Sequence, residues 1–77
     1  MAYNKDKVDE LTLALLYLVT EKNKDGARAW KGFDWDTMNR LHEKRYIGDP
    51  KSKAKSVALS EDGERLSEEL FKKYFSL

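Results

Sequence analysis

The apolar run at residues 11–19 constrains the fold of this chain more than any other feature. Only Thr12 and the small Ala14 interrupt it, so a helix through the run carries large apolar side chains on nearly every side. The 3-4-3 spacing of one helical face is met by Val8, Leu11, Leu15 and Leu18. The run therefore predicts a central core helix, or one that also contacts a partner subunit.

The length and the amino-acid usage predict one small soluble domain. The chain has 77 residues and no cysteine, so disulfides and thiolate metal sites are excluded and a reducing cytoplasm is expected. The N-terminal residues show no signal-peptide pattern. The apolar run is also much shorter than the roughly 20 residues that span a bilayer, which excludes a membrane-spanning protein.

Two further helices and a small sheet are expected after the first helix. Asp34 is a candidate cap for a helix over residues 35–44, and Ser60 for the last helix, whose first turn is acidic. Short extended segments are expected at 28–30, 46–47 and 56–59, the last two as a hairpin joined through a loop at 51–55. The prediction is an α+β domain in the order helix, short strand, helix, β-hairpin, helix.

The expected core combines one face of each helix with the strand at 56–59. The residues predicted to be buried together are Leu11, Leu15, Leu18, Trp35, Met38, Leu41, Val57, Leu59, Leu66, Leu70 and Phe71. Trp30, Phe33 and Trp35 form an aromatic cluster that is expected mainly in the core. The alternative is that these rings, interleaved with Arg28 and Lys31, stack on the bases of single-stranded nucleic acid.

Residues 41–66 resemble the recognition-helix end, wing and following helix of MarR-like winged-helix regulators. A basic hairpin followed by the sequence LSEDGE at residues 59–64 carries this resemblance. Too few residues separate the first two predicted helices for a complete winged helix, so a reduced winged-helix-like domain is expected. The resemblance implies a DNA-binding or regulatory role.

Nearly the whole chain resembles an uncharacterised family of short bacterial proteins, a domain of unknown function. The motifs that carry this resemblance are LALLYL at 13–18, RAWKGFDWD at 28–36, RLHEK at 40–44, DP at 49–50 and KAKSV at 53–57. Members of the family usually have glycine where this chain has Arg45, just past the second helix. The resemblance implies either a strained left-handed Arg45 or a different helix end.

Positive charge is concentrated at residues 40–55, where six basic residues stand beside two acidic ones. The residues predicted to contact nucleic acid are Arg40, Lys44, Arg45, Lys51, Lys53 and Lys55. If the hairpin is extended, the three loop lysines point to one side and can follow a phosphate backbone. They can equally protect a sheet edge from aggregation. Asp34 and Asp36, at the start of the second helix, disfavour contacts with bases.

No residue set predicts catalysis, a metal site or a cofactor. His42 is the only histidine and has no nucleophile at a recognisable spacing, so a structural or surface role is expected. Asp34 and Asp36 could in principle act as an acid–base pair, but a helix cap and a first-turn acid explain them.

A homodimer is a further expectation, because so short a chain can hardly enclose both terminal helices. Its predicted interface residues are Tyr17, Tyr74 and Phe75. Two functions therefore remain open for a non-enzymatic binding protein. One is nucleic-acid binding or regulation through a basic wing, and the other is a protein–protein interaction module, of the kind associated with phages or mobile elements.

Overall fold

Each helix of the computed structural model, which describes residues 1–77, begins at a capping side chain. The helices are α1 (Lys5–Leu18), α2 (Trp35–Glu43) and α3 (Glu61–Phe75). The caps, each accepting a hydrogen bond from the amide three residues further on, are Asn4, Asp34 and Ser60. Such bonds satisfy amides that lack a partner in the first helical turn, which is why the helices begin here.

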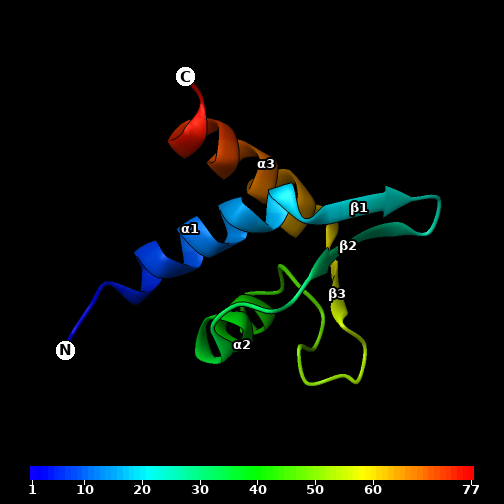
Figure 1. The fold of residues 1–77 in the computed structure, drawn as a ribbon, viewed down its shortest axis with the longest axis horizontal. Helices are drawn as coiled ribbons and strands as arrows, with labels where there is room; N and C mark the ends of the chain where they lie inside the picture. The colour runs from blue at the N-terminus through cyan, green and yellow to red at the C-terminus, as the bar shows by residue number, and fades with distance from the viewer.

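Three short strands form one antiparallel sheet beyond the C-terminal end of α1 (Figure 1). The strands are β1 (Thr20–Asn23), β2 (Gly26–Trp30) and β3 (Ser56–Leu59), in the order β1-β2-β3. A tight turn before Gly26, which has a φ of 127°, joins β1 to β2. Along β2 the side chains alternate, so Ala27 and Ala29 are buried and Arg28 and Trp30 are exposed.

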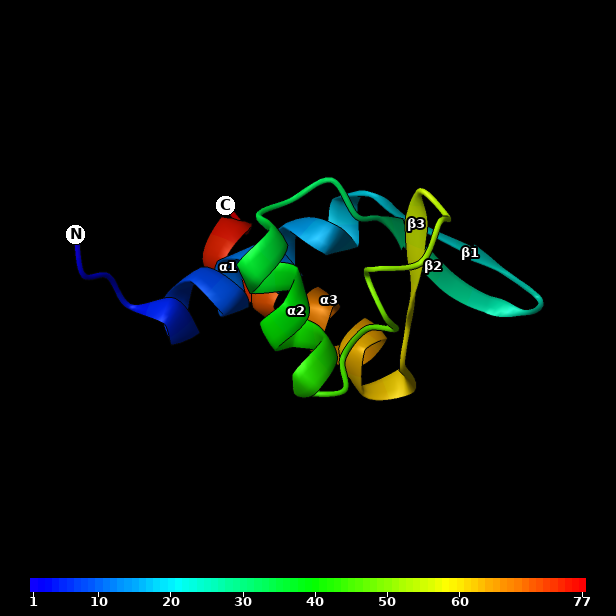
Figure 2. The same ribbon diagram turned by 90° about the horizontal axis from the view of Figure 1, so that it is seen from below.

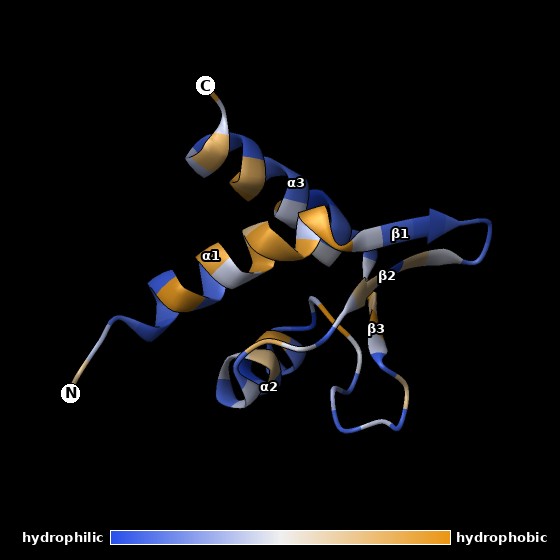
Figure 3. Cartoon of the chain, in the orientation of Figure 1, coloured by the Kyte–Doolittle hydropathy of each residue, from blue (hydrophilic) through white to orange (hydrophobic).

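The α+β class and the order helix, strand, helix, hairpin, helix are confirmed. The hairpin expected at 46–47 and 56–59 is short, with one bridge between Ile47 and Leu59 and a 2.8 Å bond from the Gly48 amide to the Ala58 carbonyl. Strand β1 was not expected, because its sequence TEKN reads as a polar turn segment. In Figure 3 this edge strand is almost entirely hydrophilic.

The core lies where α1 and α3 meet, with α2 and the inner side of the sheet closing it (Figure 2). Its fully buried side chains include Leu13 and Leu16 of α1 and Met38 and Leu41 of α2. Burial is confirmed for five of the residues expected in the core, namely Met38, Leu41, Val57, Leu59 and Leu70. Three more are half-buried, namely Leu11, Leu66 and Phe71.

The expected core face of α1 is wrong. Leu15 is 37% exposed and Leu18 is 63% exposed, whereas Leu13 and Leu16 are buried together with Asp9. The expectation that Trp30 and Trp35 belong to the core is also wrong, because both are about half exposed. The reason for the error in α1 is that the buried side includes an aspartate, which a search for apolar spacing passes over.

The end of α2 resolves the question raised by Arg45. This residue has a φ of 66° and therefore adopts the strained left-handed conformation. The Arg45 amide donates to the His42 carbonyl at 2.9 Å, and the Tyr46 amide to the Leu41 carbonyl at 3.1 Å. This pair of bonds defines a Schellman motif, in which glycine is the usual residue at the position of Arg45.

We expect Arg45→Gly to raise the free energy of unfolding by about 1 kcal/mol, because glycine removes the left-handed penalty at a small cost in chain entropy. Urea unfolding followed by circular dichroism measures the change. Arg65→Gly, at an exposed position inside α3, is the control and should destabilise the chain by about 1 kcal/mol. A loss of stability in Arg45→Gly would mean that the arginine side chain contributes more than the strain removes.

The start of α3 is joined closely to the end of α2. The Ser60 hydroxyl donates to the Arg45 carbonyl at 2.7 Å, and the Ser60 amide donates to the Tyr46 carbonyl at 3.0 Å. A β-carbon added to Gly63 would lie 2.0 Å from the Tyr46 carbonyl oxygen. Only a residue without a side chain lets the two backbones approach so closely.

Candidate functional site

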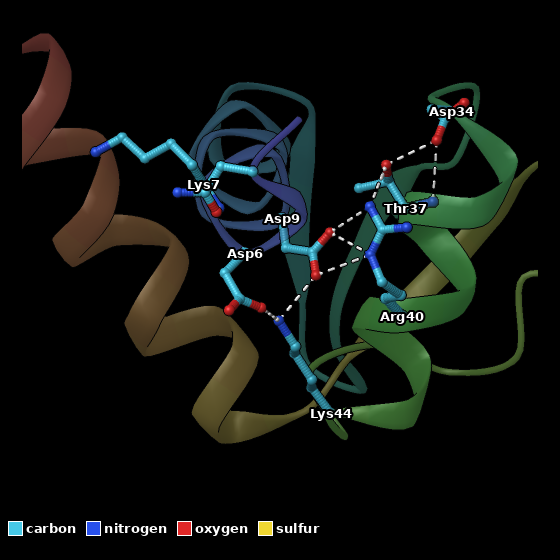
Figure 4. A network of polar contacts seen from close by, with 8 residues as sticks. Asp6, Lys7, Asp9, Asp34, Thr37, Arg40 and Lys44 are labelled. Carbon is cyan, nitrogen blue, oxygen red and sulfur yellow. Dashed lines mark hydrogen bonds and ion pairs between the residues drawn. The ribbon is translucent and has the colours of Figure 1, made fainter. Parts of the chain in front are cut away.

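The predicted nucleic-acid contacts on α2 are occupied inside the molecule. Arg40 Nε donates to both carboxylate oxygens of Asp9, at 2.9 and 3.1 Å, and Lys44 Nζ lies 2.8 Å from the same carboxylate. Lys44 also reaches the exposed Asp6 at 3.4 Å. Figure 4 shows that both cations of α2 point toward α1. Their charge is therefore largely neutralised before any partner arrives.

Asp9 is the centre of this network and is only 2% exposed. Burial by itself would raise the pKa of its carboxyl group, but hydrogen bonds and charge from Arg40 and Lys44 outweigh that effect and lower the pKa. Asp34 extends the network, because its carboxylate accepts bonds from the amide and hydroxyl of Thr37, which also lower its pKa. Arg40 in turn donates to the Thr37 hydroxyl at 3.1 Å. The network thus holds α2 against α1.

We expect this network to make stability depend on acid. Asp9 stabilises the fold fully above 3.8, the ordinary pKa of an aspartate, and the contribution is lost as pH falls through the lower pKa of the folded state. Urea unfolding at a series of pH values below 5 measures the slope. Asp9→Asn should flatten it, whereas Asp36→Asn, at an exposed position without an ion pair, should not. Equal slopes for native chain and Asp9→Asn would contradict this account.

The remaining predicted basic residues do not join Arg40 and Lys44. Residues 50–55 form turns and bends instead of an extended wing, so the alternation of Lys51, Lys53 and Lys55 does not place them on one side. Lys31 fastens this loop by donating to the carbonyls of Pro50 and Ser52. All three loop lysines and Arg45 are exposed. The structure therefore divides the predicted basic surface between a neutralised pair and an open loop.

Lys51 and Lys55 lie beside different neighbours. Lys51 borders a shallow depression with residues of the outer side of α2, including His42 and Glu43. His42 Nδ1 lies 3.1 Å from the Ile47 carbonyl, which gives this histidine a local structural contact. Lys55 instead borders the outer side of the sheet, where it shares a depression with Arg28 and Trp30.

The predicted interface residues make contacts within the chain. The ring of Tyr17 packs on Phe71, with 5.1 Å between centroids, and Phe71 packs on Phe75 at 5.3 Å. The Tyr74 hydroxyl donates to Glu10 at 2.7 Å and accepts from Lys7 at 2.8 Å. Tyr17 and Tyr74 thus close the α1–α3 junction, and Phe75 keeps the larger exposed area at the end of α3.

The surface that sequence reasoning missed is the side of α1 turned away from Asp9. We call it the outer face, and its residues are Val8, Leu11, Leu15, Leu18 and Val19. In Figure 3 α1 carries the densest run of hydrophobic residues in the chain. Packing against α3 and α2 uses its other two sides. The 3-4-3 spacing did reveal this face, but the spacing alone does not tell a core face from an exposed one.

The aromatic cluster borders the outer face at the C-terminal end of α1. Val19 and Trp30 line the same depression on the sheet, which has a volume of about 270 Å³. Trp30 meets Phe33 edge to face, with 6.2 Å between ring centroids, and its indole lies close over Gly32. Trp30 is therefore held in place and still half exposed.

Fold and site together define a small α+β domain with one helix face uncovered. The chain matches the model of a domain of unknown function, DUF6429, over residues 4–77. It is 47% identical over 76 residues to the uncharacterized protein y4hR of Sinorhizobium fredii (strain NBRC 101917 / NGR234), with 99% of each chain covered. The chain belongs to the DUF6429 family, which confirms the uncharacterised family expected from the motifs. No solved structure matches it, and none of its helices is long and apolar enough to cross a bilayer.

Proposed function

We propose that this protein is a non-enzymatic protein–protein interaction module that binds through the outer face of α1. The observation that carries the proposal is the exposure of Leu15 and Leu18 on a helix whose other sides are packed. Large apolar side chains at helical spacing are the pattern by which a helix is read by a protein partner. Contiguous exposed apolar surface of this kind usually marks such a site.

The placement of charge supports a protein partner over DNA. Arg40 and Lys44 are committed to Asp9, so two of the six predicted phosphate contacts are already neutralised. Asp34 and Asp36 lie at the start of α2, where carboxylates repel a phosphate backbone. The outer face itself carries no charged side chain among its five residues.

Affinity capture with three forms of the chain tests this proposal. The native chain and Trp35→Glu should retain the same protein, because Trp35 lies on the side of α2 opposite to Lys44 and so away from α1. Leu18→Glu should lose that protein while keeping its helical circular dichroism, because Leu18 is mostly exposed. Equal retention by Leu18→Glu and the native chain would overturn the proposal.

A second candidate is binding of single-stranded nucleic acid on the outer side of the sheet. Trp30 offers a half-exposed ring next to Arg28 and Lys55, and aromatic rings beside cations stack on bases. The MarR-like resemblance of the loop region points the same way. Arg28 is partly committed, because it donates to the side chain and carbonyl of Ser56 at 2.8 Å.

Fluorescence anisotropy with a labelled oligonucleotide at low salt tests the second candidate. Binding should weaken in Trp30→Ala and in the triple change of Lys51, Lys53 and Lys55 to alanine. Each lost phosphate contact on duplex DNA lowers the salt slope by about 0.9. Unchanged affinity in both variants, or no binding at low salt, would dismiss this candidate.

A further inference from the structure

We infer that the partner of the outer face is a second copy of this chain, packed with the two α1 helices antiparallel. This inference rests on the proposed function and names its partner. The 3-4-3 spacing of the outer face reads the same in both directions. An antiparallel copy therefore sets Val8 against Leu18 and Leu11 against Leu15 across a two-fold axis, and the same pairs recur on the other side. A face that is complementary to itself needs no other partner.

The exposed area is of the size that a dimer requires. By the general scaling, a folded monomer of this mass exposes about 4,900 Å², whereas this chain exposes 5589 Å². The excess of about 700 Å² is close to the roughly 800 Å² that each partner buries in a standard interface. The chain ends, with Met1 and Leu77 fully exposed, contribute part of the excess, and the outer face and Trp30 contribute apolar area.

Charges at the two ends of the outer face select the antiparallel orientation. Lys5 begins α1, and Glu21 follows Val19 just past the other end of the helix. Neither residue forms an ion pair within the chain. Antiparallel packing brings Lys5 of one copy toward Glu21 of the other, whereas parallel packing would bring like charges together. Antiparallel helices also align their dipoles favourably.

Sedimentation equilibrium over a concentration series tests for the second copy. The native chain and Trp35→Glu should approach twice the subunit mass of 9.0 kDa, and Leu18→Glu should stay at 9.0 kDa while remaining folded. A native mass of 9.0 kDa at every concentration would overturn the inference. If a different protein were then captured through Leu18, the proposed function would stand and only the identity of the partner would be wrong.

Cross-linking tests the orientation, and the absence of cysteine gives it a clean background. Leu11→Cys and Leu15→Cys chains of different tag length are mixed and treated with a short bis-maleimide. Antiparallel packing should give mainly the mixed product, whereas each variant alone should cross-link weakly. Self-linking of Leu15→Cys above the mixed product would indicate parallel helices and overturn the orientation. Products no more abundant than with the control Trp35→Cys would overturn the face itself.

Discussion

Leu16→Ala is expected to lower the free energy of unfolding by about 2–5 kcal/mol, the range for truncating a fully buried leucine. Leu16 has no exposed surface and lies on the side of α1 that meets the core. Domains of this kind are usually stable by only about 5–15 kcal/mol, so the variant could be partly unfolded at room temperature. Urea unfolding followed by circular dichroism measures the loss.

Leu15→Ala is the matched control, because it removes the same atoms from the neighbouring position. Leu15 is 37% exposed, so its truncation should cost clearly less than that of Leu16. If the chain dimerises through the outer face, the comparison must be made at low concentration, where the interface contributes little. A larger loss for Leu15 than for Leu16 in the monomer would show that the two sides of α1 have been exchanged.

Gly63→Ala should destabilise the chain by about 3 kcal/mol, at the upper end of the cost of overpacking. Helix propensity alone predicts the opposite, because alanine inside a helix is favoured over glycine by about 1 kcal/mol. The clash dominates because the atom in the way is the backbone oxygen of Tyr46, which Ser60 also holds by a hydrogen bond. Thermal or urea unfolding gives the sign directly.

Gly48→Ala provides the control for Gly63, since the same methyl group is added beside the same part of the chain. Its added carbon would lie 3.8 Å or more from its neighbours, which is ordinary contact. The change should be neutral or should stabilise the fold by about 0.4–1 kcal/mol through the unfolded state. A stabilised Gly63→Ala would mean that α3 can shift away from Tyr46 at little cost.

Local signals in the sequence predicted the helices well. Asn4, Asp34 and Ser60 lie where short-range rules place caps, and the left-handed Arg45 follows from its position after α2. These features depend on residues three or four positions apart, so one sequence is enough to see them. The polar edge strand β1 was missed because it is defined by pairing with β2 and not by its own composition.

The orientation of α1 could not be predicted for a different reason. A helix that is apolar on nearly every side does not indicate which side is buried. The choice depends on Asp9, which is buried only because Arg40 and Lys44 arrive from a helix some thirty residues later. The same long-range pairing removes these two cations from the predicted basic surface. Fold and candidate site were thus misjudged at one point, by one ion-pair network.

The half exposure of both tryptophans decides which spectroscopic signal is informative. Trp30 and Trp35 are in contact with water in the folded chain, so their emission should change little on unfolding, and stability is better followed by circular dichroism. Covering either ring by a partner would shift its emission to shorter wavelength. Trp35→Phe leaves Trp30 as the only emitter, next to Val19 at the end of the outer face. The chain therefore carries a built-in optical reporter for association at that face.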